Sequence, residues 1–208
     1  MEKILKYEMI LPLWPKLTCD FICDPANEEA YKLAVSQNWD RLIIYGSYGK
    51  TALAKYLAKN FNFFILDPNI RLTMDNYNVI WDYIPSNFYS VSAFHAWNIY
   101  PGKIIVILEN HPLAANILPN DLKTRLIEAK CVKICPPSKN LKIQIFKLWL
   151  NSMHVNITDS GLNFLFSVEN DTLPNLYIKA KILHKYAYEK QREITIHSIH
   201  DCINKKIW

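Results

Sequence analysis

Short apolar runs recur through roughly the first 135 residues, and segments with helical spacing of apolar positions lie between several of them. Five runs have the length and composition of strands, at residues 41–45, 63–66, 77–82, 103–108 and, more weakly, 131–135. Their nearly continuous hydrophobicity is typical of strands covered on both faces, as in a parallel sheet. Helical spacing occurs at residues 27–34, 51–60 and 88–100. This alternation predicts an α/β fold.

The pattern changes after Pro136 and Pro137. From Ser138 onward the sequence shows no strand pattern, and four segments have helical spacing, at residues 141–150, 160–168, 176–188 and 195–203. Ser138, Thr158 and Thr195 stand where N-caps of three of these helices are expected. The sequence therefore predicts an extended N-terminal segment over 1–18, an α/β core lobe over 19–136 and a small all-helical lobe over 137–208.

Length and composition favour one compact domain with two lobes. The chain has 208 residues, of which 50% are hydrophobic, so it can bury a sizeable core. The longest wholly apolar stretch, Ile104 to Leu108, is far shorter than the roughly 20 residues that cross a bilayer. The opening Met1-Glu2-Lys3 does not resemble a signal peptide. We therefore expect a cytoplasmic protein that makes no use of a membrane.

The formal net charge of +5 favours encounters with acidic partners without selecting DNA, nucleotide or protein. A basic run interleaved with tyrosines lies near the C-terminus, at Lys179, Lys181, Lys185, Lys190 and Arg192 with Tyr177, Tyr186 and Tyr188. Such a run is either a nucleic-acid or partner surface or, more commonly, a solvated helix face. No metal site is expected, because Cys131 and Cys135 on one strand would stand about 13 Å apart. His197 and His200 are predicted to lie on the surface of a helix.

The turn after the first strand carries the candidate phosphate site. It reads Gly46-Ser-Tyr-Gly49-Lys50-Thr51, between a strand and a helix, where backbone N–H groups and a helix N-terminus hold an anion in phosphate-binding loops. Lys50 and Thr51 occupy the positions of the phosphate-contacting amine and the magnesium-binding hydroxyl. The full motif has four residues between its first glycine and its Gly-Lys pair, and this loop has only two. An ordinary strand-to-helix turn is therefore favoured over a working nucleotide site.

Two other residues bear on the same site. Asp82 ends the third apolar run, where a carboxylate that holds magnesium through water is expected, although a turn-capping aspartate fits equally well. Tyr48 places a ring where a small residue would let the loop backbone approach phosphates. Weak or absent nucleotide binding is the expectation.

The order of these features resembles the DnaA-related AAA+ family, and in particular its short Hda-like members, over nearly the whole chain. The segments that carry the resemblance are Cys19-Asp-Phe21 through Asn27-Glu-Glu-Ala30, Tyr45 through Thr51, Asp82, and Ile105-Val-Ile-Leu-Glu-Asn-His-Pro112 followed by Asp121-Leu-Lys-Thr-Arg-Leu126. The resemblance implies an AAA+, P-loop NTPase-like parallel sheet flanked by helices, with the helical lobe as its lid. It also implies the absence of the initiator's C-terminal DNA-binding domain.

The resemblance assigns roles to individual residues. Arg125 stands at the arginine finger, which is offered to nucleotide on a neighbouring subunit, although a solvated helix charge is the alternative. Asn110 lies near the polar sensor position. Efficient AAA+ ATPases have an acidic residue where this chain has Tyr83, which cannot polarise an attacking water at neutral pH. The sensor arginine of the lid falls at Pro174, which has no charge. The nucleotide site is therefore expected to be degenerate, with no cofactor or only weakly bound ADP or ATP with magnesium.

The N-terminal segment resembles the sliding-clamp-binding peptide of Hda-like proteins at Glu8-Met9-Ile-Leu11-Pro12-Leu13. Such a peptide binds in extended form, with Met9, Leu11 and Leu13 as apolar anchors, and Pro12 limits the entropy lost on docking. Glu8 departs from the pattern because a carboxylate cannot donate the hydrogen bonds of the usual glutamine. A strand packed on its own domain explains the segment equally well.

These features together predict a regulator of replication initiation with the sliding clamp and the DnaA initiator as partners. It would promote hydrolysis of DnaA-bound ATP and contact DNA only weakly or indirectly; self-association is left open. The first alternative is an AAA+ ATPase with a contracted loop that uses Lys50, Thr51 and Asp82. The second is a DNA-binding accessory factor that uses the basic face of the helical lobe.

Overall fold

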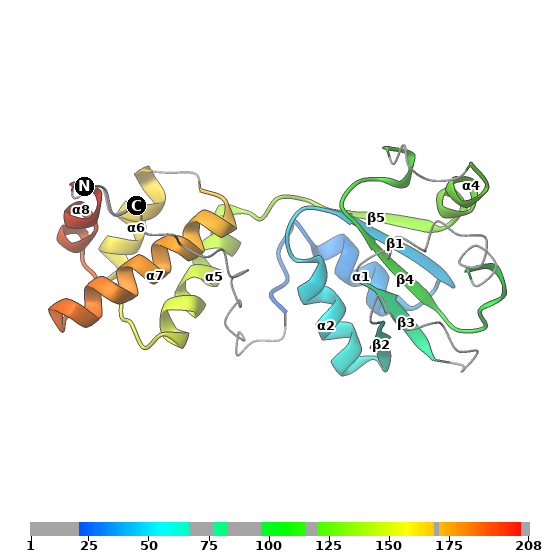
Figure 1. The fold of residues 1–208 in the computed structure, drawn as a ribbon, viewed down its shortest axis with the longest axis horizontal. Helices are drawn as coiled ribbons and strands as arrows, with labels where there is room; N and C mark the ends of the chain where they lie inside the picture. Colours follow the sequence, from blue (N-terminus) through cyan, green and yellow to red (C-terminus); the bar gives the residue numbers. More distant parts are fainter. Residues whose placement is uncertain (1–20, 67–76, 83–96, 115–119, 169–170, 205–208) are drawn as a thin grey trace, which may run out of the picture. The chain divides into compact units, whose positions relative to one another are not determined.

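The chain forms two compact units, one from Asp20 to Leu141 and one that contains the residues from Lys142 onward (Figure 1). The structure is a computed structural model, and it describes residues 21–66, 77–82, 97–114, 120–168 and 171–204. None of the helices in these ranges is long and apolar enough to cross a membrane.

The first unit is built on a five-stranded sheet in the order β2-β3-β4-β1-β5, in which every pair of neighbours is parallel. The strands are β1 (Arg41–Gly46), β2 (Phe63–Ile65), β3 (Asn78–Trp81), β4 (Ile104–Leu108) and β5 (Lys130–Ile134). The parallel sheet predicted from the sequence is confirmed, and each strand lies within two residues of its predicted bounds. In the centre, Ile43 pairs with Val106 on one side and with Cys131 on the other.

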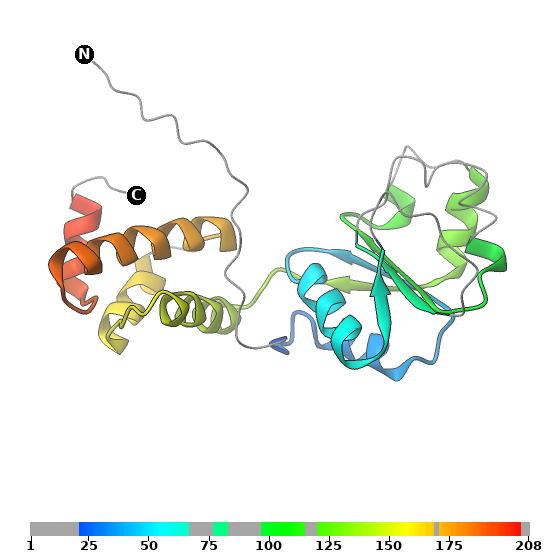
Figure 2. The same cartoon turned by 60° about the horizontal axis from the view of Figure 1, so that its bottom comes forward.

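Both faces of this sheet are covered, which explains why the central residues of its strands are mostly apolar on both faces. Leu42 and Ile44 point to the face covered by α1 (Glu28–Ser36) and α2 (Lys50–Asn60). Ile43 points to the opposite face, which is covered by the segment around Trp97 and Tyr100 and by α4 (Asn120–Glu128). The two layers are visible on either side of the sheet in Figures 1 and 2. Of the helix predicted over 88–100, residues 83–96 lie outside the described ranges, and 97–99 are helical.

A short polar joint ties the start of the first unit to the chain that leaves β5. Asp24 is buried, and its carboxylate accepts hydrogen bonds from Ala26 N at 3.0 Å and from Ser138 Oγ at 2.6 Å. Cys135 N donates to Ala26 O at 2.9 Å. Ser138 therefore caps the next helix while it is held by the sheet unit.

The second unit contains α5 (Lys139–Ser152), α6 (Asp159–Val168), α7 (Leu173–Lys190) and α8 (Ile196–Asn204), and the four predicted helices are confirmed. The three predicted N-caps are also confirmed: Ser138 Oγ accepts from Leu141 N, Thr158 Oγ1 from Gly161 N, and Thr195 Oγ1 from Ser198 N. Among the described residues after 138, the only strand-like pairing is an isolated bridge between Ile157 and Ile194. The core shared by these helices is centred on Phe146, Trp149, Leu176, Leu183 and Ile199.

Candidate functional site

Lys50, Thr51 and Asp82 meet at the carboxyl end of the sheet. Gly46 ends β1, α2 begins at Lys50, and Asp82 directly follows β3. Thr51 Oγ1 donates a hydrogen bond to Asp82 Oδ1 at 3.0 Å, although the two residues are 31 positions apart in the chain. A hydroxyl and a carboxylate in this arrangement supply the oxygen ligands that a hydrated magnesium ion uses beside a phosphate-binding loop.

The loop ahead of α2 is tied to the neighbouring strands. Gly46 N donates to Glu109 O at 3.2 Å, and Ser47 N donates to Ile134 O at 2.9 Å. Gly46 has a φ of 110°, and a Cβ there would lie 2.3 Å from Ile134 O, so only glycine fits. Gly49 has a φ of 109°, but an added Cβ would meet nothing within 4 Å, so this glycine is required for its conformation alone. Two N–H groups of this short loop are therefore already bonded within the sheet unit.

Lys50 folds back onto the same loop. Its Nζ donates to Gly46 O at 2.6 Å and to Ser47 O at 2.7 Å. Burial lowers the pKa of Lys50, and the nearby carboxylates of Glu109 and Asp82 oppose that shift. A polyphosphate at this loop would have to take the amine away from both carbonyls and would find the N–H groups of Gly46 and Ser47 bonded elsewhere. The oxygens of Thr51 and Asp82 suit a hydrated magnesium ion, whereas in this structure the Lys50 amine and the N–H groups of Gly46 and Ser47 are bonded within the sheet unit.

Burial raises the pKa of the Asp82 carboxyl above its ordinary value near 3.9. The hydrogen bond from Thr51 and the charges of Lys55 and Lys50 oppose this rise without cancelling it. A raised pKa in the folded state means that Asp82 favours folding below the ordinary pKa of an aspartate. That contribution is lost as the pH rises through the folded-state pKa, so at neutral pH the ionised carboxylate is a cost to the fold.

Asp82→Asn is accordingly expected to raise the melting temperature by about 1–2 °C at pH 7.5 and to have no stabilising effect near pH 3.5. The amide keeps the oxygen that accepts from Thr51 but carries no charge to desolvate. Thermal unfolding by circular dichroism at both pH values measures the difference. Asp40→Asn is the matched control, because the Asp40 side chain is 92% exposed and should not move the melting temperature. A fall in melting temperature at pH 7.5 would show that the Asp82 charge stabilises the fold.

Glu109 is a neighbour of this site that sequence reasoning missed. Its backbone oxygen accepts from Gly46 N, and its carboxylate acts on the charge of Lys50. The available signal was its position directly after β4, because β4 lies beside β1 and both strands end at the same edge. Asn110, the residue chosen from the sequence, is the next one along and is exposed.

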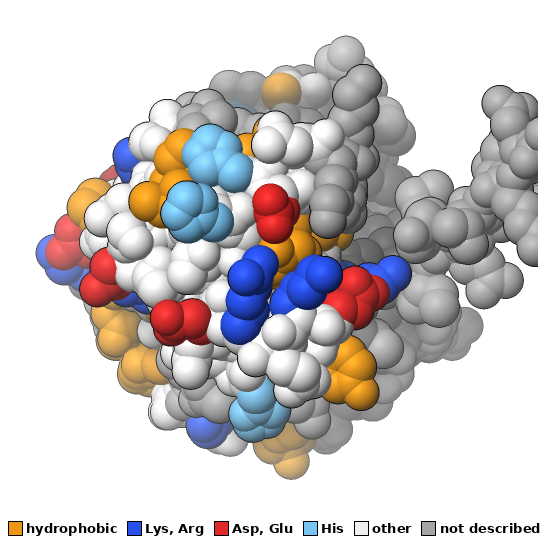
Figure 3. Space-filling model, turned by 90° about the vertical axis from the view of Figure 1, so that its left-hand side faces the viewer, with side chains coloured by type: hydrophobic (Ala, Val, Ile, Leu, Met, Phe, Trp, Pro, Cys, Tyr) orange, Lys and Arg blue, Asp and Glu red, His pale blue; other side chains and the backbone are white. Residues whose placement is uncertain are grey.

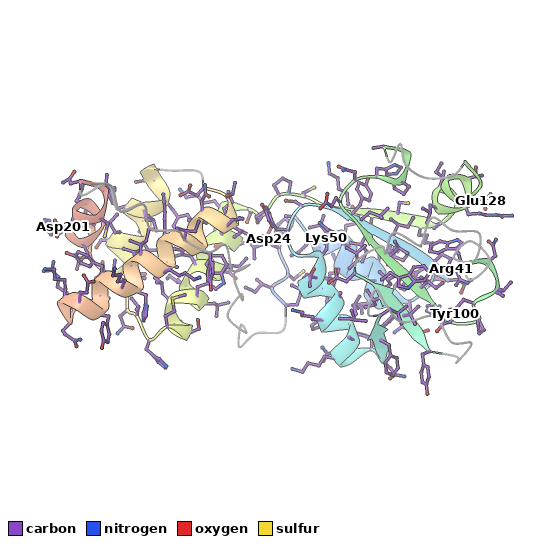
Figure 4. All side chains as sticks on the ribbon, in the orientation of Figure 1. Asp24, Arg41, Lys50, Tyr100, Glu128 and Asp201 are labelled. Carbon is purple, nitrogen blue, oxygen red and sulfur yellow. The ribbon has the colours of Figure 1, made fainter. Side chains whose placement is uncertain are left out.

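Arg125 lies at the other end of the sheet. It stands in the last turn of α4, shortly before β5 begins at Lys130, so it is near the amino ends of the strands. Figure 4 shows Glu128, the ion-pair partner of Arg125, and Lys50 at opposite ends of this unit. The six residues of β1 span about 20 Å. The Arg125 side chain is 50% exposed, and its Nη1 lies 3.0 Å from Glu128 Oε2. Arg125 is therefore remote from the Lys50–Thr51–Asp82 cluster of its own chain and open to a partner.

In the helical unit, part of the predicted basic run is buried and not at the surface. Lys179 is buried, with its Nζ 2.6 Å from Asp171 Oδ2, and Tyr177 and Tyr186 are also buried. Lys185 lies 3.9 Å from Glu189 Oε1. Figure 3, which views the end of the helical unit, shows basic and acidic side chains interspersed on that end. The reading of the run as a solvated helix face is therefore favoured over a nucleic-acid surface.

The remaining predicted residues are placed as follows. Pro174 lies in the first turn of α7, where a missing N–H is tolerated. His200 packs against Phe164 and, like His197, is exposed. Within the described ranges no group of three or more histidine, cysteine or acidic side chains could hold a metal ion. Tyr83 and the segment Glu8, Met9, Leu11, Pro12 and Leu13 lie outside the described residues.

The fold is shared with solved structures of replication initiation proteins and of RuvB. Domain III of the Thermotoga maritima replication initiation protein DnaA matches with a TM-score of 0.68 and 20% identity, over 86% of this chain and 91% of that one. A DNA replication initiation factor matches with a TM-score of 0.67 and 17% identity, over 84% of this chain and 66% of its own. A variant of Thermotoga maritima RuvB matches with a TM-score of 0.63 and 15% identity, over 88% and 70%. No family model and no curated protein sequence matches the chain.

The chain therefore has the fold of an AAA+ module, with a parallel sheet flanked by helices and a helical unit after it. Among proteins of this fold, its similarity extends to domain III of DnaA and to RuvB. At 20% identity or less, this similarity concerns the fold alone.

Proposed function

We propose that this protein regulates replication initiation by presenting Arg125 to ATP that is bound by a DnaA initiator. The observation that carries the proposal is the position of Arg125, exposed at the end of the sheet away from its own Lys50, Thr51 and Asp82. An arginine in that place has no nucleotide of its own chain within reach. It is available to a nucleotide on another subunit.

The chemistry asked of Arg125 is electrostatic. During hydrolysis, the bond between the γ-phosphorus and the bridging oxygen of ADP breaks, a bond from water oxygen to the phosphorus forms, and a water proton is released. Negative charge builds on the departing and equatorial oxygens as this happens. A guanidinium beside them neutralises that charge and lowers the barrier, so one protein accelerates hydrolysis on another.

The protein's own nucleotide site has a subsidiary part in this proposal, with no bound nucleotide or only weakly held ADP or ATP with magnesium. Support comes from the loop, where the Lys50 amine is bonded to Gly46 O and Ser47 O and where two N–H groups are bonded to the neighbouring strands. The short loop and the proline at position 174 agree with this. The protein would then act by binding other proteins through its surface and would not depend on a nucleotide of its own.

The experiment that tests the proposal is a reconstituted reaction with purified DnaA charged with labelled ATP, sliding clamp loaded on DNA, and this protein. The conversion of initiator-bound ATP to ADP is followed over time with and without the protein. We expect faster conversion only when the protein is present. An unchanged rate across a range of protein concentrations would refute the proposal.

Binding of this protein to the sliding clamp is expected to depend on the N-terminal peptide from Glu8 to Leu13. Changing Leu11 and Leu13 together to alanine removes two apolar anchors and should lower clamp capture by at least about tenfold. Surface plasmon resonance on immobilised clamp measures the affinity. Ile4→Ala plus Leu5→Ala is a matched control outside the peptide, and it should bind like the unchanged protein. Equal affinity of both double variants would remove the tether from the proposal.

An intrinsic ATPase is the second candidate, and one observation favours it: the 3.0 Å contact between Thr51 and Asp82, which is the pairing a magnesium ion requires. Calorimetry with ATP and magnesium separates the two candidates. Micromolar affinity that disappears in Lys50→Ala, together with turnover by the isolated protein, would favour the ATPase.

A further inference from the structure

We propose that a cavity beside Arg125 receives the polyphosphate of the partner's nucleotide and that Lys130 is a second residue that positions it. The cavity has a volume of about 490 Å³, and its walls include Arg41, Asn98, Arg125, Glu128 and Lys130. It lies at the amino end of the sheet, where Figure 4 shows Arg41 and Glu128. The identity of the occupant rests on the proposed function, while the affinity of the cavity for phosphate does not.

Arg41 gives this cavity a fixed positive charge. Its guanidinium donates to four backbone oxygens, those of Trp97 at 2.9 Å, Tyr100 at 2.7 Å, Gly102 at 2.8 Å and Asp40 at 3.0 Å. These acceptors are neutral, so they hold the cation in place without cancelling its charge. Burial lowers the pKa of Arg41, and the charge of the Asp40 carboxylate opposes that shift without cancelling it.

Lys130 adds an exposed positive charge to the same cavity. It is exposed at the first position of β5, and its Nζ donates to the backbone oxygen of Asn38 at 2.6 Å, which is again a neutral acceptor. Lys130 and Arg125 are therefore two exposed cations on one cavity, with Arg41 behind them.

Two carboxylates oppose these three cations among the residues that line the cavity. Glu128 pairs with Arg125, and Asp40 stands in solvent, 3.8 Å from Lys103. An exposed ion pair is weak, at about 0–1 kcal/mol, so a phosphate can displace Glu128 from Arg125. The excess of positive over negative side chains around the cavity favours an anion with several charges over a single carboxylate.

A polyphosphate fits this arrangement better than an acidic peptide. If Arg125 engages the γ-phosphate, the phosphates that precede it in the nucleotide remain charged and must lie near the same wall. Lys130 supplies a flexible ammonium for them, which binds phosphate as a point charge. Its effect would be on the affinity and placement of the nucleotide-bearing partner, and the effect of Arg125 would be on the rate of bond cleavage.

The first test uses the isolated full-length protein and inorganic triphosphate as the probe. Lys50→Ala is the background, so that its own loop contributes no binding, and calorimetry is run at 50 mM and 300 mM salt. Adding Lys130→Ala should weaken triphosphate binding at least fivefold at low salt, with a smaller effect at high salt. Lys130→Arg should restore it. The matched control is Lys133→Ala, an exposed lysine on the same strand that does not line the cavity, and it should leave affinity unchanged.

Equal affinities for the Lys130→Ala and Lys133→Ala proteins, or no detectable binding in the Lys50→Ala background, would overturn the inference. This holds whether or not the protein acts on DnaA. In the reconstituted reaction, Lys130→Ala should raise the half-saturating protein concentration about five- to tenfold and leave the maximal rate within about twofold.

The two proposals fail in different ways. Normal stimulation by the Lys130→Ala protein, with loss in the Arg125→Ala protein, would overturn the role of Lys130 and leave the proposed function standing. No stimulation by the unchanged protein, with triphosphate still bound through Lys130, would overturn the proposed function alone. Weaker capture of nucleotide-free DnaA by the Lys130→Ala protein, without a change in triphosphate affinity, would identify an acidic protein segment as the occupant and refute the polyphosphate.

Discussion

Replacing Arg125 by alanine is expected to lower the maximal rate of DnaA-bound ATP hydrolysis by about 10³-fold, or to the rate of the initiator alone. The guanidinium is the only part of this protein that the proposed function places beside the transferred phosphoryl group. Alanine removes it from an exposed site, so the fold should keep its stability within about 0.5 kcal/mol. The loss should therefore appear in the rate at saturating protein and leave the half-saturating concentration nearly unchanged.

Glu128→Gln is the matched control for this prediction. It breaks the 3.0 Å ion pair with Arg125 and leaves the guanidinium in place, so stimulation should stay within about threefold of the unchanged protein. Arg125→Lys keeps the charge but loses the planar pair of donors and should recover only a small part of the rate. If Arg125→Ala stimulates as well as the unchanged protein, the guanidinium has no catalytic role and the proposed function falls.

The sheet was predictable because each of its strands is covered on two faces. Leu42, Ile43 and Ile44 alternate between two separate cores, so three consecutive positions of β1 are apolar and the run stands out in the sequence. Helix N-caps were predictable for a local reason: Ser138, Thr158 and Thr195 bond to backbone N–H groups three residues onward. Both signals need only a few consecutive residues.

The residues of the candidate nucleotide site could be predicted from the sequence, but the hydrogen bonds that they make could not. Gly46, Gly49, Lys50 and Thr51 form a recognisable turn, and Asp82 follows a buried run. The bonds from Lys50 to the loop carbonyls, and from Gly46 and Ser47 to the strands on either side, depend on which strands flank β1. The sequence shows that the loop is short, and the structure shows where its polar groups are bonded instead.

The cavity at the other end could not have been predicted from spacing. Arg41, Asn98 and Lys130 come from three segments that are separated by more than thirty residues each, and only the strand order brings them together. No local pattern marks Arg41 as a residue that bonds four backbone carbonyls. Its position at the first residue of β1 reads in the sequence as an ordinary charged strand end.

Lys179 was misassigned although the sequence did carry a signal. Leu176, Leu183 and Tyr186 lie three residues before, four after and seven after Lys179, and this is the spacing of one helix face. All three are buried, so the same face buries Lys179. The composition of the basic run does not distinguish Lys179 from its neighbours. Its position on the buried face of the helix does distinguish it from Lys181 and Lys185, which are exposed.

Lys179→Ala is therefore expected to destabilise the helical unit by about 2–3 kcal/mol and to lower its melting temperature by about 8–24 °C. The Lys179 and Asp171 side chains are only 9% and 15% exposed, and their charged atoms lie 2.6 Å apart. Removing the lysine leaves an uncompensated carboxylate with little access to water. Circular dichroism at 222 nm through urea and thermal unfolding measures the loss, and Lys185→Ala, at a side chain 79% exposed, should change stability by less than about 0.5 kcal/mol.

The Lys179–Asp171 pair as a whole should contribute far less to the free energy of unfolding than the loss in the Lys179→Ala variant suggests. Burial lowers the pKa of Lys179 although Asp171 Oδ2 lies 2.6 Å from its Nζ, so keeping the lysine charged at this place is costly. Replacing both residues with apolar ones, Lys179→Met with Asp171→Leu, removes the desolvation together with the attraction, and the double variant should unfold within about 1 kcal/mol of the unchanged protein. Additive losses in the double variant would show that the two residues stabilise the unit separately. A single Lys179→Ala variant as stable as Lys185→Ala would show that Lys179 is solvated and that the burial of this face stops short of it.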